Sequence, residues 1–337
     1  MVHCARLVLL LFSIGLMSCA GQKPPTEKID GISFVAARDS INTDHVQPVV
    51  DLGANYAAIM PFGFIRDLSN PEIRFNTERQ WFGEQREGVK QYIETLKKRD
   101  IKIMMKPQIW IWHGEFTGHL QMDSEEDWQK LEKSYTDFIM LYAELAEETD
   151  TELLCIGTEL ENFIKERPSY WSDLIAEIKK VYTGKLTYAA NWDEYKRTPF
   201  WHQLDYIGID AYFPVSEAST PSVEDCIEGW QVHKKEMQSR ALKMDKPIVF
   251  TEFGYRNVDF TAKEPWKADR DMTSNNFEAQ SNATKALFEV FWEEEWFAGG
   301  FIWKWFHNHD EVGGMDSNQF TPQNKPVEEI IRAYYRK

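Results

Sequence analysis

The sequence predicts an α/β fold, a (β/α)8 or TIM barrel in a single domain, and two observations carry that prediction. Eight short apolar runs recur along the chain, and helical patterns separate most of them. Short apolar runs are typical of buried parallel strands, and their repeated alternation with helices is typical of this barrel. A doubly wound open sheet is the alternative, but no Gly-rich phosphate loop follows the first run.

The expected elements follow one another from Gly31 to the last residues of the chain. Strands are expected at 31–36, 55–60, 101–106, 152–158, 185–190, 204–210, 247–252 and 298–303. Apolar residues at helical spacing predict helices at 83–99, 124–145, 168–181, 223–244, 276–295 and 326–335. Ser124 with Asp127 resembles a capping box, and Pro168 suits a first helical turn. Long loops are expected where strands end, at 61–82, 107–124, 253–275 and 304–325.

The N-terminal residues resemble a secretory signal. A basic residue precedes the apolar stretch 7–16, which is too short to span a bilayer as a mature helix. Leu16-Met17-Ser18-Cys19 resembles the lipobox of bacterial lipoproteins, in which the Cys is acylated; an ordinary signal peptide with a chance Cys is the alternative. We expect a signal peptide at 1–18, a lipidated Cys19 and tether at 19–28, and the barrel at 29–337. The expected location is the bacterial cell envelope, with the lipid as the only contact with the membrane.

Composition narrows the class of partner. The net charge is −16 and no run of Lys or Arg occurs, so we expect no nucleic acid partner. The 13 Trp residues suit a cleft that binds sugars, although a large aromatic core is the alternative. Cys155 and Cys226 remain after processing, and we expect both to be free, buried thiols. We expect a monomer.

Two glutamates mark the expected reaction site. Glu159 ends the apolar run that begins at Leu153, and Glu252 ends the run that begins at Pro247. These are the fourth and seventh strands of the predicted barrel, and barrels of this kind keep catalytic groups at such ends. One such glutamate alone is more often a member of an ion pair. Two carboxyls facing one cleft suit glycoside hydrolysis, where one protonates the leaving oxygen and the other attacks carbon or activates water.

Motifs along most of the chain resemble glycoside hydrolase family 113 of clan A, whose characterised members are chiefly β-mannanases. The motifs are Ala58-Ile59-Met60-Pro61, Met105-Lys106-Pro107-Gln108-Ile109-Trp110, Cys155-Ile156-Gly157-Thr158-Glu159-Leu160, Ala190-Asn191-Trp192-Asp193, Ile207-Gly208-Ile209-Asp210-Ala211-Tyr212, Thr251-Glu252-Phe253-Gly254-Tyr255, Phe301-Ile302-Trp303-Lys304-Trp305 and Phe320-Thr321-Pro322-Gln323-Asn324-Lys325-Pro326. The resemblance implies a retaining hydrolase in which Glu159 is the acid/base and Glu252 the nucleophile. It also implies cleavage of β-1,4-mannan or manno-oligosaccharides.

Several further residues are candidates for binding substrate. The resemblance implies that a Tyr holds the nucleophile, and Tyr212 is the candidate; packing at the barrel rim is the alternative. Trp303 and Trp305 share one side of the last strand by alternation, so one is expected under the sugar and the other in the core. Residues expected to contact sugar hydroxyls or rings, with surface roles as the alternative, are Asn191, Trp192, Lys106, Gln108 and Trp110.

One departure from the clan leaves the substrate open. Much of clan A has Asn before the acid/base, where it contacts the sugar 2-hydroxyl, and this chain has Thr158. The alternatives are the same chemistry on another β-linked glycan, such as a β-glucan or a chitosan-like polymer, or a non-catalytic glycan-binding lipoprotein. The groups His113 with His119 and His307-Asn308-His309-Asp310 have no third ligand at a recognised spacing, so we expect neither a metal nor a cofactor. Sugar contacts or hydrogen bonds within the loops are expected of them instead.

Overall fold

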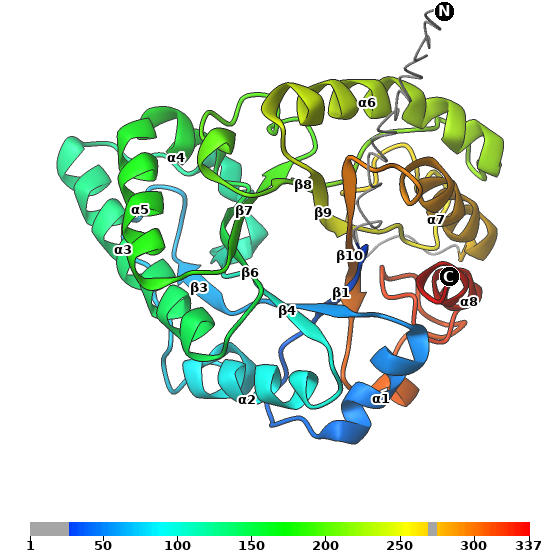
Figure 1. Cartoon of the computed structure of the whole chain (residues 1–337), viewed down its shortest axis with the longest axis horizontal. Coiled ribbons are helices and arrows are strands. Elements are labelled where there is room, and N and C mark those ends of the chain that lie inside the picture. Colours follow the sequence, from blue (N-terminus) through cyan, green and yellow to red (C-terminus); the bar gives the residue numbers. More distant parts are fainter. Residues whose placement is uncertain (1–26, 269–274) are drawn as a thin grey trace, which may run out of the picture.

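Eight parallel strands close a barrel in the computed structural model, which describes residues 27–268 and 275–337 (Figure 1). The expected signal peptide at 1–18 and lipidated Cys19 lie outside the described residues. The barrel strands are β1 (Ile29–Phe34), β2 (Tyr56–Ile59), β4 (Lys102–Met105), β6 (Leu153–Thr158), β7 (Lys185–Asn191), β8 (Ile207–Asp210), β9 (Ile248–Phe253) and β10 (Phe297–Trp305). The predicted (β/α)8 barrel is confirmed.

Helices surround the barrel on its outer side (Figure 1). They are α1 (Thr43–Leu52), α2 (Arg86–Lys97), α3 (Glu125–Glu148), α4 (Glu161–Glu166), α5 (Pro168–Val181), α6 (Val223–Met244), α7 (Phe277–Phe291) and α8 (Pro326–Tyr335). Ser124 caps α3 by accepting a hydrogen bond from the Asp127 amide, and Pro168 occupies the first turn of α5, as the sequence predicts. Two helices were not predicted, the short α4 and α1, which contains Pro48 in its interior. Burial of Val46, Val49 and Leu52 outweighs the effect of that proline.

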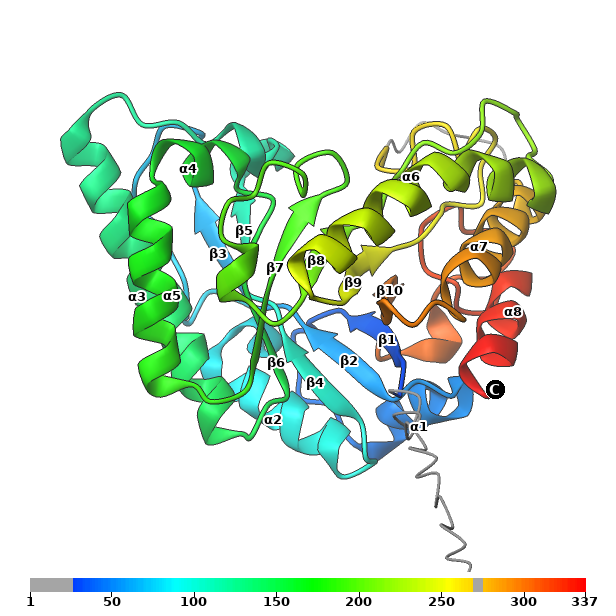
Figure 2. The same cartoon turned by 45° about the horizontal axis from the view of Figure 1, so that its top comes forward.

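Two predicted loops begin instead as strands. β3 (Phe62–Ile65) and β5 (Gln108–Ile111) pair in parallel as a separate two-stranded sheet. The ladder between β2 and β4 leads directly into this pair, because Lys106 N donates to Ile59 O at 2.8 Å and Gln108 N donates to Pro61 O at 3.0 Å. Gln108 therefore starts β5, where a loop was predicted. Figure 2 shows β3 and β5 between the helices α3 and α5 and the barrel strands β7 and β8.

The barrel interior is divided between an apolar and a polar region. Alternate strand residues point inward and fill the interior with apolar side chains: Ile29, Ala58, Met104, Leu153, Cys155, Ala189, Val249 and Phe301. Nearer the carboxyl ends of the strands, the buried groups are polar and include Lys106, Asp210 and Glu252. Cys155 and Cys226 are both buried and free, as expected.

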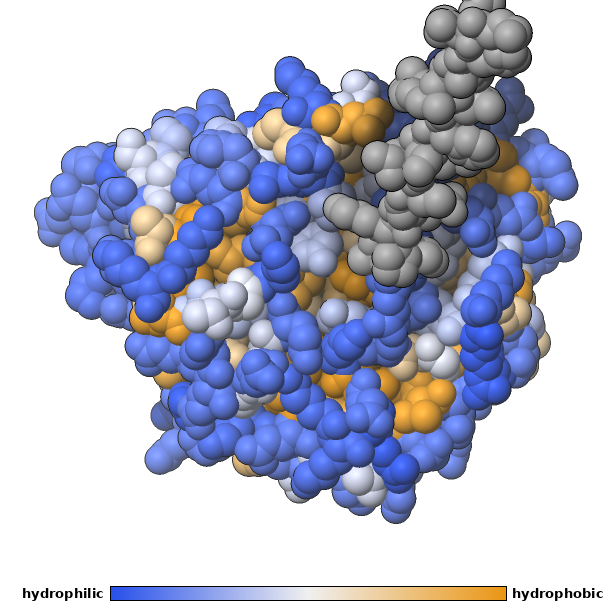
Figure 3. Space-filling view, in the orientation of Figure 1, coloured by the Kyte–Doolittle hydropathy of each residue, from blue (hydrophilic) through white to orange (hydrophobic). Residues whose placement is uncertain are grey.

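The outer surface is mostly hydrophilic on the side seen in Figure 3, with smaller apolar areas between polar side chains. Within the described ranges, no helix has both the length and the apolar character needed to cross a membrane. The apolar side chains are instead concentrated between the strands and the surrounding helices.

Candidate active site

The two glutamates stand at the same end of the barrel because their strands are parallel. Glu159 directly follows β6 and has a left-handed backbone, with φ of 51°. Two contacts hold that backbone: Glu159 N donates to Ala189 O at 2.8 Å, and Thr117 Oγ1 donates to Glu159 O at 3.0 Å. Glu252 lies within β9 itself, and its side chain is only 9% exposed. One carboxyl thus comes from a strand and the other from the turn after a strand.

Three donors fix the Glu252 carboxylate. Lys106 Nζ and Gln108 Nε2 both reach Oε1, at 2.5 and 3.1 Å, and Tyr212 OH donates to Oε2 at 2.8 Å. Hydrogen bonds to a charged acceptor are among the stronger ones, and three of them leave little rotational freedom. The resulting carboxylate is oriented, which is what a nucleophile needs.

Behind the carboxylate lies an ion pair that the sequence analysis did not identify. Lys106 Nζ also lies 3.1 Å from Asp210 Oδ1, and Thr251 Oγ1 donates to the same oxygen at 2.7 Å. Burial and the charge of Glu252 raise the pKa of Asp210 to about 7, although Lys106 opposes that shift. Burial lowers the pKa of Lys106, but Asp210 and Glu252 together raise it above its ordinary value. Asp210 ends a buried strand, the same signal that singled out Glu252.

Replacing Lys106 tests whether its positive charge stabilises the fold by compensating the negative charges of Asp210 and Glu252. We expect Lys106→Met to lower the free energy of unfolding by about 3–5 kcal/mol, because two buried carboxylates would then lack a counterion. Urea unfolding monitored by Trp fluorescence measures the loss. In the double variant Lys106→Met/Asp210→Asn the net charge of the group returns to its original value. That double variant should be more stable than Lys106→Met alone; equal or lower stability would contradict this account.

The Glu159 carboxyl is in a different environment. Burial, followed by the negative charges of Asp210 and Glu252, raises its pKa well above the ordinary value, and Lys106 only partly opposes this. In the part of the chain that the structure describes, no group donates a hydrogen bond to its side chain. A carboxyl whose pKa is raised keeps its proton to a higher pH than an ordinary Glu, which suits a general acid.

A second buried carboxyl supports the turn that carries Glu159. Leu160 N donates to Tyr188 OH at 2.6 Å, and Tyr188 OH donates to Glu194 Oε1 at 2.8 Å. Asn191 N donates to the other oxygen of Glu194 at 3.0 Å. Burial raises the pKa of Glu194 to about 8. Neither Tyr188 nor Glu194 was predicted, because only the folded arrangement brings them behind the turn.

The predicted roles of Lys106 and Gln108 need correction. Lys106 is fully buried and its ammonium is engaged by two carboxylates, so it has no free position for a sugar hydroxyl. Gln108 is 8% exposed and donates to Glu252. Both side chains hold the Glu252 carboxylate, and Tyr212 contacts the same carboxylate at the position expected for it.

The structure separates the two tryptophans of the last strand. Trp305 is fully buried and packs against His309 with ring centroids 5.4 Å apart, so it belongs to the core and is not available to a sugar. Trp303 is half-buried, and Lys304 Nζ lies 5.4 Å from its ring centroid. Of the two, only Trp303 retains a surface on which a sugar can stack.

The remaining predicted residues occupy the surrounding surface. The side chain of Asn191 is used locally, because its Oδ1 accepts from Trp192 N at 2.6 Å. Trp192 stacks on Trp266, with ring centroids 5.5 Å apart. Trp110 lies on β5 and is 47% exposed. None of these three side chains forms a hydrogen bond with Glu159 or Glu252.

The two histidine groups have local partners. His309 Nε2 lies 3.2 Å from Glu328 Oε1, and the His307 ring packs against His45. In the other group, the rings of His113 and His119 pack against those of Trp112 and Phe116. Among residues 27–268 and 275–337, no group of three His, Cys, Asp or Glu side chains is arranged to hold a metal ion. These histidines serve the packing of the loops.

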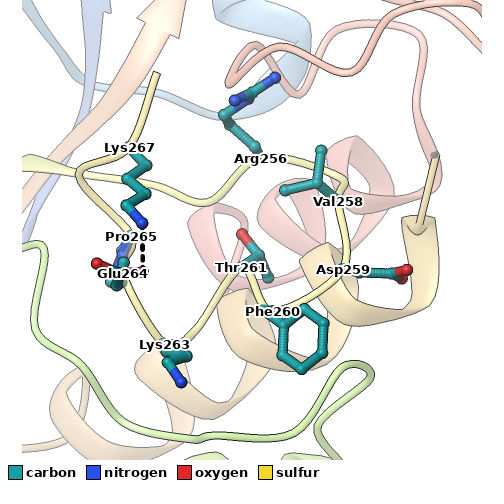
Figure 4. A pocket seen from close by; sticks show the side chains of 9 residues that line it. All are labelled: Arg256, Val258, Asp259, Phe260, Thr261, Lys263, Glu264, Pro265 and Lys267. Atoms are coloured by element: carbon teal, nitrogen blue, oxygen red, sulfur yellow. Dashed lines mark hydrogen bonds and ion pairs between the residues drawn. The ribbon is translucent and has the colours of Figure 1, made fainter. Parts of the chain in front are cut away.

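A cavity of about 350 Å³ lies in the loop after β9, lined by residues between Arg256 and Lys267 (Figure 4). Its charged lining is paired within the protein: Lys267 with Glu264 at 2.5 Å, and Lys263 with Glu217 at 2.6 Å. Neither Glu159 nor Glu252 lines it. We therefore regard it as separate from the carboxyl pair.

A TIM barrel with an acidic pair at the ends of its fourth and seventh strands defines a class of glycoside hydrolases. The model of Glycoside Hydrolase Family 113 matches residues 36–325, and the chain belongs to that family. The protein is therefore an enzyme that hydrolyses glycosidic bonds, and its substrate is a glycan.

Solved structures show the same fold. The GH113 β-mannanase AaManA from Alicyclobacillus acidocaldarius, in complex with ManMIm, has a TM-score of 0.78 at 20% identity, covering 92% of this chain and 97% of that chain. A GH113 β-1,4-mannanase has a TM-score of 0.79 at 22% identity, covering 92% and 99%. A β-glucuronidase from Faecalibacterium prausnitzii has a TM-score of 0.62 at 15% identity, covering 92% and 49%. No curated protein matches.

Proposed function

We propose that this protein hydrolyses β-1,4-mannan or manno-oligosaccharides with retention of configuration, using Glu252 as nucleophile and Glu159 as acid/base. The observation that carries the proposal is the contrast between the two carboxyls. Glu252 accepts three hydrogen bonds, whereas burial and like charges raise the pKa of Glu159. Two titratable groups in contrasting environments are the usual basis for assigning acid and nucleophile.

The proposed reaction has two displacements. Glu252 Oε attacks the anomeric carbon as the glycosidic bond breaks, and Glu159 gives its proton to the departing oxygen. This step leaves a glycosyl ester on Glu252 and an ionised Glu159. Glu159 then takes a proton from water, the resulting hydroxide attacks the anomeric carbon, and the Glu252 ester bond breaks. Glu159 ends protonated and Glu252 ends as a carboxylate, ready for another cycle.

Mannan as the substrate rests on the family and on similar structures described as β-mannanases. Thr158, the residue before the acid/base, does not show how the sugar 2-hydroxyl would be recognised. Its Oγ1 is buried, and no described group forms a hydrogen bond with it. Mannose and glucose differ at that hydroxyl. Two alternatives therefore stand beside mannan hydrolysis. One is the same reaction on another β-linked glycan, such as a β-glucan or a chitosan-like polymer, and the other is glycan binding without catalysis.

Reducing-sugar release from mannan, β-glucan, chitosan and xylan tests the proposal. We expect release from mannan by the wild type, and almost none by Glu159→Ala or Glu252→Ala. Release from another polymer alone would change the substrate while keeping the chemistry. Binding without release by the wild type would support the non-catalytic alternative, and unchanged activity in both variants would refute the assignment of the carboxyls.

We also propose that the mature protein is attached to the bacterial cell envelope through a lipid on Cys19. Support comes from the lipobox-like Leu16-Met17-Ser18-Cys19 and the short apolar stretch before it. The remaining chain from 29 to 337 is then the catalytic domain, a monomer whose contact with the membrane is the anchor.

Replacing Cys19 tests the anchor. We expect Cys19→Ala to move the protein from the membrane pellet to the soluble fraction after cell fractionation, because no thiol remains for acylation. Metabolic labelling with a palmitate analogue gives an independent reading, with label on the wild type and none on Cys19→Ala. A secreted Cys19→Ala protein that still sediments with membranes would argue against lipid anchoring.

A further inference from the structure

The two-stranded sheet formed by β3 and β5 extends the active site beyond the barrel rim. Its residues pair in register, Phe62 with Gln108 and Phe64 with Trp110. Paired residues of parallel strands project from the same face, and residues two apart along a strand do too. Phe62, Phe64, Gln108 and Trp110 therefore share one face of this sheet.

That shared face begins at the reaction site. Gln108 Nε2 donates to Glu252 Oε1 at 3.1 Å, so this end of the face touches the nucleophilic carboxylate. Trp110 is two residues farther along, about 7 Å at the usual rise of a strand. The face thus starts beside the Glu252 carboxylate and leads outward from it.

The opposite face of the sheet is occupied by the protein core. Ile65 and Ile111 are 2% and 1% exposed, and the space beside Gly63 is filled by Ile73, Ile109 and Phe138 of α3. The shared face is different, because Phe62 and Phe64 are partly exposed and Trp110 is 47% exposed. The sheet is covered on one side and open on the other.

We propose that this open face, with Trp110 and Phe64 at its outer end, is a binding subsite for pyranose units of the glycan at a distance from the bond that is cleaved. Flat aromatic rings stack on the apolar faces of sugar rings, and the hydroxyl groups at the edge of the sugar remain in contact with water. Continuity with Glu252 argues for the substrate chain itself as the occupant. The inference rests on the proposed function and adds selection for longer chains to it.

The test compares kcat/KM for a ladder of manno-oligosaccharides, and of cello-oligosaccharides as a second series, from two to six sugars. The wild type is expected to gain in kcat/KM as the chain lengthens. Trp110→Ala should lose about 10-fold on the hexasaccharide and stay within about twofold of the wild type on the shortest substrate that is cleaved. Trp110→Phe keeps a flat ring and should retain most of the gain. Phe64→Ala should lose part of it, with thermal unfolding measured for every variant.

The outcomes separate this inference from the proposed function. A wild type that cleaves neither series would refute the proposed function, and calorimetry with both hexasaccharides would then test the inference separately. Tighter binding by the wild type than by Trp110→Ala would support the subsite, and equal binding or no binding would overturn it. A wild type that cleaves a series, together with an equal gain with chain length in Trp110→Ala, would overturn the inference alone. A uniform loss on all chain lengths would also overturn it, because an outer subsite does not act on short substrates.

Discussion

Glu252→Ala should lose on the order of 10⁴-fold or more in kcat on mannan, as expected when a covalent catalyst is removed. The loss of fold stability should be small beside the loss of activity, since Lys106 keeps Asp210 as its ion-pair partner when the Glu252 carboxylate is removed. Steady-state kinetics and thermal unfolding of the same preparation separate the two effects. The loss is expected in kcat, because the formation of the covalent intermediate is what disappears.

Adding azide to the Glu252→Ala variant tests whether Glu252 is the nucleophile. The Ala side chain leaves room beside the anomeric carbon, and azide can attack there while Glu159 still protonates the leaving group. We expect recovered turnover of an aryl β-mannoside and a glycosyl azide of inverted configuration, assigned by NMR. Wild-type enzyme incubated with azide is the control. Absence of any azide product would indicate that Glu252 is structural and would place the nucleophile elsewhere.

Glu159→Ala should separate substrates by their leaving groups. Cleavage of mannan needs a proton at the departing oxygen, and its loss should reduce kcat/KM by about 10²–10⁴-fold. A dinitrophenyl β-mannoside has a leaving group that departs without a proton, so its first displacement should survive. Deglycosylation then lacks a base, and stopped-flow traces should show a burst of dinitrophenol followed by slow turnover.

The pH profile gives a second measure of Glu159. The acid works only when protonated, so activity falls as the pH rises through its pKa. Because burial and the charges of Asp210 and Glu252 raise that pKa, the alkaline fall in kcat/KM should lie above the range of an ordinary Glu. In Glu159→Ala acting on the dinitrophenyl substrate, this fall should disappear. If the alkaline fall in kcat/KM remained unchanged in Glu159→Ala, another group would be the acid. If azide gave a glycosyl azide of inverted configuration with Glu159→Ala, the roles of Glu159 and Glu252 would be exchanged.

The sequence was sufficient to predict the barrel and the positions of the two glutamates within it. Strands buried on both faces are nearly continuous apolar runs, and a carboxylate that ends such a run is conspicuous. Asp210 also ends an apolar run, but its place in the site was not predicted. The role of a buried acid at such a position depends on its ion-pair partner. That partner, Lys106, is 104 residues away along the chain.

Other features depend on contacts that no local pattern contains. No helix was predicted at α1; proline disfavours a helix interior, yet burial of Val46 and Val49 on either side of Pro48 stabilises α1. Alternation placed Trp303 and Trp305 in equivalent positions, whereas one is half-buried and the other fully buried. The support of the Glu159 turn by Tyr188 and Glu194 joins two neighbouring strands and becomes visible only in the fold.

The sheet of β3 and β5 has a consequence for the entropy of binding. A cleft wall made from a flexible loop must become ordered when a ligand arrives, and that ordering reduces affinity. The sheet of β3 and β5 continues the hydrogen-bonded ladder of β2 and β4 and packs on α3. The rings of Phe64 and Trp110 are therefore held in place before a ligand binds. A stiff, extended polysaccharide has little conformational freedom to lose either. The protein thus presents a preorganised surface to a preorganised ligand, and modest contacts can contribute almost their full free energy to binding.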